Sequence, residues 1–164
     1  RVVAANAERI LSAVTAEAHR RLRARGVRPS LDDVLLWWHQ QNGQLTNFDL
    51  LASHMDLFKP PTAEQFRPDP FKIGANSLIS TAFGVADAEH MRKLQSNFED
   101  KLIENVAFAH VETTKGKPML SIEQIDVTLP GRHFPARFVY KRLLLPVHDG
   151  KGNNFVLNYS QALE

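Results

Sequence analysis

The chain has 164 residues, of which 43% are hydrophobic, 23% charged and 9% aromatic, and these globular values exclude wholesale disorder. The 20 basic and 18 acidic residues leave a net charge of only +2, which gives no support for a nucleic-acid partner. The absence of cysteine excludes disulfides, thiolate metal sites and thiol nucleophiles. No apolar run reaches the roughly 18 residues that a membrane-spanning helix needs, so we expect a cytoplasmic protein with no membrane partner.

The first third of the chain predicts three helices. Residues 4–25 carry a narrow, alanine-rich apolar stripe at helical spacing, which fits packing within the chain as well as packing on a second copy. We interpret residues 1–28 as an added N-terminal helix for dimerisation or signalling. A second helix is expected over residues 30–41, where Ser30 is the N-cap, and a third over residues 47–58.

The middle of the chain changes from a proline-rich loop to helices. Residues 59–70 contain four of the nine prolines and predict a loop on the surface, followed by a short strand. A helical turn is expected over residues 77–83. Asp87 then caps a longer helix that extends towards Phe108, with a break near residues 96–97.

The last third of the chain predicts an antiparallel meander. Strands are expected over residues 118–129, 134–147 and 155–159, separated by a turn at 130–132 and a hairpin loop at 148–154. Helices followed by a meander, rather than alternating strands and helices, indicate the α+β class.

Residue types that carry catalysis are present but do not cluster. The seven histidines show no metal-ligand spacing and no nucleophile motif occurs, so we predict no catalytic residues and no metal site, and an enzyme is not supported. The aromatic residues bracket the sheet and its covering helices, where they either line an apolar cavity or fill the core. The expected ligand-binding residues are Phe83, Phe98, Phe108, His110, Tyr140 and Arg142.

Several short segments resemble a known family. The run Tyr140–Val147, with Asp149-Gly150 after it, resembles the end of a PAS sensory domain of the divergent subfamily common in alphaproteobacteria. Trp37-Trp38 is similar to the helical entry of that subfamily, and Phe83-Gly84 is similar to a short segment after its early strand. The resemblance covers roughly residues 37–160.

The resemblance implies a PAS-like domain over residues 29–164, with a five-stranded antiparallel sheet and flanking helices. It also implies a non-catalytic sensory or regulatory role in signal transduction, through a small-molecule ligand, a homodimer or a signalling partner protein. The cofactor stays unknown, because PAS domains bind varied ligands. The flavin photoadduct needs a cysteine that this chain lacks, and haem would need a ligand such as His110.

Two alternatives remain open at this point. One is a small-molecule binder or enzyme with a cone-shaped α+β fold, in which His110 and Glu123 form an acid–base pair that lines a cavity. The other is an adaptor that docks a partner on an exposed helix carrying Trp37 and Trp38.

Overall fold

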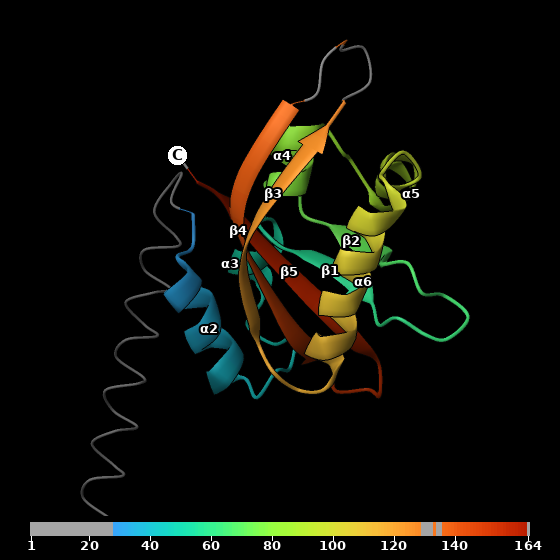
Figure 1. Cartoon of the computed structure of the whole chain (residues 1–164). Helices are drawn as coiled ribbons and strands as arrows, with labels where there is room; N and C mark the ends of the chain where they lie inside the picture. Colours follow the sequence, from blue (N-terminus) through green and yellow to red (C-terminus); the bar gives the residue numbers. More distant parts are fainter. Residues whose placement is uncertain (1–27, 129–132, 134–135, 164) are drawn as a thin grey trace, which may run out of the picture.

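The computed structural model describes residues 28–128, 133 and 136–163, which form a five-stranded antiparallel sheet with helices on both faces (Figure 1). The strand order is β2-β1-β5-β4-β3, and each neighbouring pair is antiparallel. The expected α+β class and flanking helices are confirmed, and the arrangement is consistent with a PAS-like fold. The helix expected over residues 4–25 lies outside the described residues. The elements are α2 (Leu31–Gln40), α3 (Asp49–Ala52), β1 (Asp56–Lys59), β2 (Asp69–Ile73), α4 (Leu78–Phe83), α5 (Ala88–Gln95), α6 (Asp100–Thr114), β3 (Met119–Val127), β4 (Ala136–His148) and β5 (Asn154–Ala162).

Three helices begin where the local sequence predicts. Ser30 forms a capping box with Asp33, in which each side chain accepts the backbone N–H of the other residue. Ser77 and Asp87 cap α4 and α5 by accepting an N–H from the first turn. α4 ends at Gly84, whose φ of 68° is a left-handed conformation that glycine adopts at little cost.

The helix expected over residues 47–58 is wrong in its second half. Only α3 is helical there, and the chain then turns into β1, which pairs with β2 on one side and with β5 on the other. Leu57 and Phe58 point to opposite faces of the sheet, and both are buried. A short apolar run of this kind has no alternation, so its local pattern does not separate a strand from a helix.

β2 begins inside the segment that was expected to be a proline-rich loop. Pro70 pairs with Phe58 at an irregularity in the ladder between β1 and β2. A proline is tolerated there because β2 is an edge strand, which has no second neighbour that needs its N–H. The expected short strand is therefore present, but it starts at Asp69 and ends at Ile73.

The sheet packs helices on two faces, which we call inner and outer. On the outer face, α2 and α3 cover a cluster that includes Trp37, Leu143 and Leu157. On the inner face, α4, α5 and α6 cover residues such as Leu144, which packs with Ala109 of α6. Aromatic residues on both faces thus have helices to pack against.

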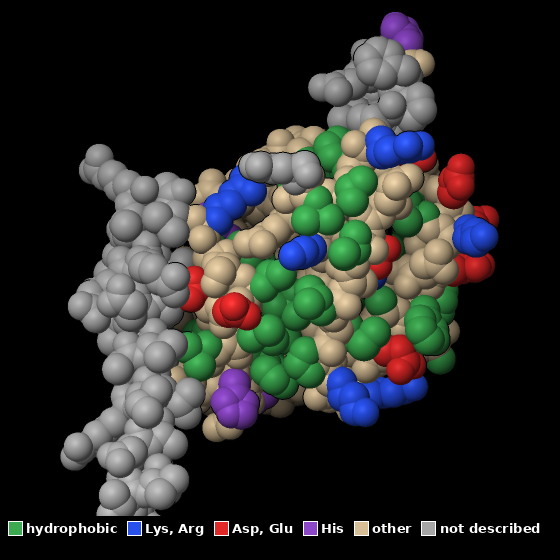
Figure 2. All heavy atoms as spheres, turned by 60° about the vertical axis from the view of Figure 1, so that its left-hand side comes forward, with side chains coloured by type: hydrophobic (Ala, Val, Ile, Leu, Met, Phe, Trp, Pro, Cys, Tyr) green, Lys and Arg blue, Asp and Glu red, His purple; other side chains and the backbone are tan. Residues whose placement is uncertain are grey.

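The outer face leaves part of β3 and β4 uncovered. Leu120, Ile122 and Val139 are exposed there and form what we call the outer patch. Figure 2 shows hydrophobic side chains gathered on the face turned towards the viewer. Exposed apolar groups gathered in this way are typical of a contact surface.

Candidate ligand-binding site

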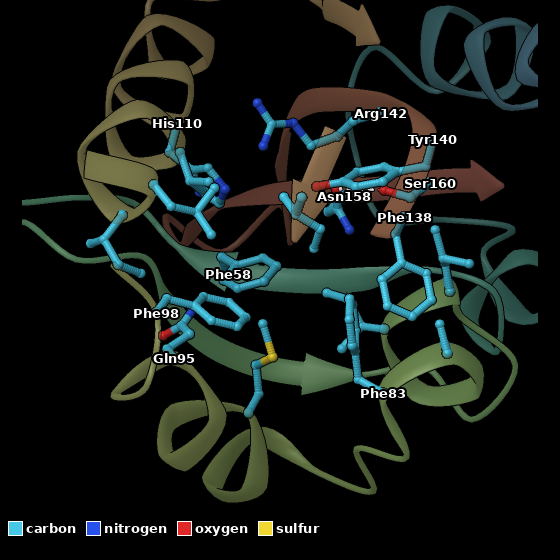
Figure 3. A pocket seen from close by; sticks show the side chains of 18 residues that line it. Phe58, Phe83, Gln95, Phe98, His110, Phe138, Tyr140, Arg142, Asn158 and Ser160 are labelled. Atoms are coloured by element: carbon cyan, nitrogen blue, oxygen red, sulfur yellow. Dashed lines mark hydrogen bonds between the residues drawn. The ribbon is translucent and has the colours of Figure 1, made fainter. Parts of the chain in front are cut away.

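A cavity of about 80 Å³ lies between the inner face of the sheet and helices α4, α5 and α6 (Figure 3). Its accessible wall is predominantly apolar. One water molecule needs roughly 10–15 Å³, and an engineered apolar cavity of roughly 150 Å³ holds benzene. The cavity therefore has room for several waters or for a molecule of a few heavy atoms.

Strand alternation supplies the sheet side of the cavity. Phe138, Tyr140 and Arg142 are every second residue of β4, so their side chains share the inner face. Asn158 and Ser160 of β5 follow the same rule and line the cavity beside them, with Ser160 directly opposite Arg142 in the ladder.

Helical spacing supplies the opposite side. Leu102, Val106 and His110 are four residues apart on α6, so they form one stripe, and all three line the cavity. Phe98 lies just before this helix and continues the stripe by the same step of four. His110 stands at the end of the stripe, where it is only 2% exposed.

The structure brings five of the six predicted ligand-binding residues to this one cavity. These five are Phe83, Phe98, His110, Tyr140 and Arg142. Phe108 is the exception, because it is 63% exposed and does not line the cavity. Two residues along a helix turn the side chain by about 200°, so Phe108 and His110 face away from each other.

Aromatic contacts shape the apolar end of the cavity. Phe83 of α4 and Phe138 of β4 meet edge to face, with ring centroids 4.9 Å apart. Phe58 of β1 meets the ring of His110 in the same way at 5.0 Å. Edge-to-face pairs of this kind fix the relative position of the elements that carry them, here a helix against a strand in each case.

The other end of the cavity is polar and is organised by Arg142. One Nη of its guanidinium donates to Glu123 Oε1 on β3 at 3.1 Å. Burial raises the pKa of the Tyr140 phenol beside Arg142, so this hydroxyl stays a neutral hydrogen-bonding group. In Figure 3, the guanidinium, the His110 ring and the Tyr140 hydroxyl lie at this same end.

Burial also decides the protonation of His110. Desolvation, with a smaller contribution from the charge of Arg142, lowers the pKa of this imidazole to about 3. His110 is therefore neutral at physiological pH, with one ring nitrogen as donor and the other as acceptor. Its Nδ1 atom is buried without a hydrogen-bond partner, and the same is true of Arg142 Nε.

A buried aspartate lies behind the polar end. Asp56 of β1 accepts a hydrogen bond from the amide of Asn158 at 3.1 Å and another from the backbone N–H of Gly74 at 3.2 Å. Burial raises the pKa of the Asp56 carboxyl to about 6, although these hydrogen bonds oppose the shift. Ser160 in turn donates to the Asn158 amide oxygen at 3.3 Å, so the amide is held from both sides.

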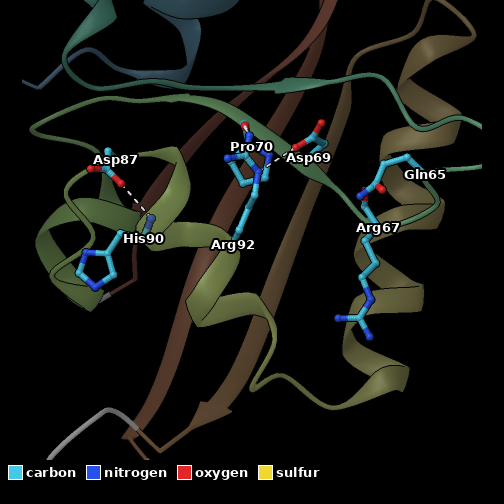
Figure 4. Close-up of polar contacts among 7 residues, drawn as sticks. All are labelled: Gln65, Arg67, Asp69, Pro70, Asp87, His90 and Arg92. Carbon is cyan, nitrogen blue, oxygen red and sulfur yellow. Dashed lines mark hydrogen bonds and ion pairs between the residues drawn. The ribbon is translucent and has the colours of Figure 1, made fainter.

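Helix α5 closes the cavity on the side of β2. Arg92, on the side of α5 that faces away from the cavity, donates to the Asp69 carboxylate at 3.1 Å and to the Pro70 carbonyl at 2.7 Å. These bonds tie α5 to β2 (Figure 4). Gln95 at the end of α5 lines both the cavity and a polar surface cleft that contains Arg67 and Arg92. The Gln95 side chain therefore separates the cavity from the surface.

The structure does not form the acid–base pair of the first alternative. Glu123 accepts from Arg142 and is absent from the cavity wall, and no hydrogen bond joins it to His110 in the described part of the chain. Within the same residues, no group of three or more metal-ligating side chains is positioned for an ion.

The docking surface of the adaptor alternative is also missing. Trp37 is 3% exposed and belongs to the core beneath α2. Both indole N–H groups are occupied, since Trp37 donates to the Thr46 carbonyl and Trp38 to the Pro146 carbonyl, each at 2.8 Å. The two tryptophans fasten α2 to the loop after it and to β4, which is a structural role.

Sequence reasoning missed Phe58, Gln95, Asn158 and Ser160 as parts of the cavity wall. Phe58 was missed because β1 was read as a helix. Asn158 and Ser160 alternate with apolar residues along β5, and that pattern is typical of a strand with one solvated face. The signal that could have found them is the pairing of the last two predicted strands, which places Ser160 opposite Arg142 and Asn158 two residues away on the same face.

Comparison with known proteins adds no family or relative to this geometry. No protein-family model matches the chain, and no match was found among curated proteins or among solved structures. The helices of the described residues are too short or too polar to cross a lipid bilayer.

Proposed function

We propose that this chain is a non-catalytic sensory or regulatory module of PAS-like architecture, which acts in the cytoplasm and binds a small molecule between its sheet and helices α4, α5 and α6. The observation that carries the proposal is the cavity, which combines an apolar body with one polar end. Two of the groups at that end, His110 and Arg142, keep a buried nitrogen without a partner. Buried polar groups in native proteins normally have partners, and a bound molecule would supply them.

The fold also suggests how a ligand in the cavity changes the rest of the domain. α5 packs Met91 and Leu94 towards the inside and is tied to β2 by Arg92 on its outside. A ligand that binds better when α5 is in one position shifts the population towards that position, by no more than its difference in affinity. The mechanism is therefore a change in the packing of α5 on the sheet.

The proposal includes a homodimer as the signalling form. The outer patch is exposed on the sheet, and the chain enters α2 close by, because Tyr159 and Gln161 of β5 both donate to the carbonyl of Pro29. The apolar stripe of residues 4–25 joins the described chain at this point. Contact between two outer faces, extended by these stripes, would link the two cavities.

Native mass spectrometry of the purified protein, followed by a denatured run, tests the ligand part. Ala82 lines the cavity, so Ala82→Phe fills it, whereas Ala86→Phe places the same side chain at an exposed position outside it. We expect a non-covalent mass on the wild type and on Ala86→Phe that is lost on denaturation, and no such mass on Ala82→Phe. An equal mass on Ala82→Phe, or no bound mass on any form, contradicts the proposal.

A further inference from the structure

Two buried nitrogens at the polar end of the cavity have no hydrogen-bond partner among the described residues. Three buried side-chain nitrogens have no partner in the described part of the chain, and two of them, His110 Nδ1 and Arg142 Nε, belong to this end. Arg142 Nε carries a hydrogen and only donates. The neutral His110 ring has one donor and one acceptor nitrogen, and its Nδ1 is buried without a partner.

The charges on the wall favour an anion. Arg142 is the one charged residue among the described residues that line the cavity, and it is 7% exposed. Its partner Glu123 is 31% exposed and lies outside the wall, so it takes one guanidinium donor and leaves Nε unpaired. The buried Asp56 carboxyl is separated from the cavity by the amide of Asn158.

The rest of the wall limits the size and the polarity of a bound molecule. Away from Arg142, the described wall carries no second charged side chain: apart from Gln95 it is made of apolar residues such as Phe58 and Phe98, and the volume of about 80 Å³ limits the number of heavy atoms. The occupant must therefore be short, apolar over most of its length and charged at one end only.

We propose that the cavity binds a small monocarboxylate, with its carboxylate against Arg142 and His110 and its short apolar tail among the aromatic side chains. An arginine edge presents parallel N–H groups that match the two oxygens of a carboxylate. This inference rests on the proposed function, since it names the chemical class of the molecule that the cavity takes.

The test compares three four-carbon probes on the full chain: butyrate, butyramide and 1-butanol. Butyramide has the same heavy-atom shape as butyrate but no charge, so the pair isolates the head group. We expect isothermal titration calorimetry to show butyrate binding at least about tenfold more tightly than butyramide, which is the usual range for a charge-assisted hydrogen bond. 1-Butanol reports on the apolar tail alone.

Two variants locate the carboxylate. Arg142→Met removes the donors while keeping an unbranched side chain, and we expect it to abolish the preference for butyrate over butyramide. Arg142→Lys keeps the charge without the fork and should retain part of the preference. Arg137→Met is the matched control, because Arg137 also pairs with a carboxylate of β3, Asp126, but on the exposed outer face. It should bind butyrate like the wild type.

The outcomes separate the two proposals. If butyramide and 1-butanol bind as tightly as butyrate, the carboxylate class is overturned and the cavity proposal stands. If none of the three binds, the carboxylate proposal is overturned and the proposed function loses support as well. A preference that survives in a folded Arg142→Met protein overturns the assignment to Arg142, and the wild-type comparison stays decisive if that variant does not fold.

Discussion

Asp56 is a carboxyl group at the centre of the sheet, only 1% exposed, and its ionisation affects stability. Its pKa is about 6 in the folded chain against an ordinary value of 3.8. Between these values the folded state keeps a proton that the unfolded state has released, so the contribution of Asp56 to stability falls as the pH rises from about 4 to about 6. His110 acts with the opposite sign, because its pKa is lowered from 6.5 to about 3.

Asp56→Asn isolates the contribution of the aspartate. The wild type should lose stability relative to the variant as the pH rises above about 4. By pH 7 this relative loss should reach up to about 3 kcal/mol in the free energy of unfolding. Urea denaturation between pH 4 and pH 8 measures it, and the His110 contribution cancels in the difference. Asp126→Asn, at an exposed carboxyl of β3, is the control and should change the curve little. Parallel curves for wild type and Asp56→Asn would refute the assignment.

At the scale of single residues, helix caps could be predicted from the sequence, whereas the contacts that a buried side chain makes in three dimensions could not. Ser30 and Asp87 could be predicted as caps because a cap depends on residues within one turn. The hydrogen bonds of Asp56 join residues 18 and 102 positions away, so no local pattern contains them. Phe108 was wrongly predicted to line the cavity with His110, because a local pattern does not show which side of α6 faces the sheet.

At the scale of elements, the junction between α3, β1 and β2 depends on Gly74. A Cβ at this position would lie 2.5 Å from the Met55 carbonyl oxygen and 2.6 Å from that of Ser53, both of them backbone atoms that do not move easily. The absence of a side chain is what lets the end of β2 approach the turn before β1.

Gly74→Ala should therefore destabilise the fold by about 1–3 kcal/mol through overpacking. Lys72→Ala is the control in the same strand, since Lys72 is exposed and its truncation should change stability by less than about 0.5 kcal/mol. The urea midpoints of the two variants decide the matter. Equal midpoints would mean that the junction relaxes around the added methyl group.

The elements themselves could be predicted wherever their stabilising contacts are local. The meander of β3, β4 and β5 was found because alternation and turn residues mark each strand. β1 was not, since its short apolar run has no alternation and one of its two partner strands, β5, lies about 100 residues later in the chain. The cavity was predicted in outline from the aromatic residues, but its polar end depends on how α6 crosses β4 and β5, which the sequence does not specify.

At the scale of the whole molecule, the outer patch predicts self-association. Ile122 is 68% exposed at its centre, so Ile122→Lys should raise the dissociation constant of the homodimer at least about tenfold. Phe66→Lys is the control, because Phe66 is also an exposed hydrophobic residue but lies in the loop before β2. Sedimentation velocity over a range of concentrations measures both variants against the wild type.

Deletion of residues 1–26 completes that experiment. The shortened chain should also associate more weakly, because it loses the apolar stripe of residues 4–25. An unchanged dimer after the deletion would remove these residues from the interface and leave the outer patch as the contact. A wild-type chain that is monomeric at every concentration would rule out the homodimer altogether.

The pairing of the first described strand with the last has a consequence for how the protein is made. β1 and β5 are neighbours in the middle of the sheet, with Leu57 opposite Leu157. A ribosome that has released β1 must still synthesise about 100 residues before the partner strand emerges, which takes seconds at the usual rate of elongation. Throughout that interval the edge of β1 that later pairs with β5 is free and exposed to aggregation, and the sheet is completed only after β5 has been synthesised.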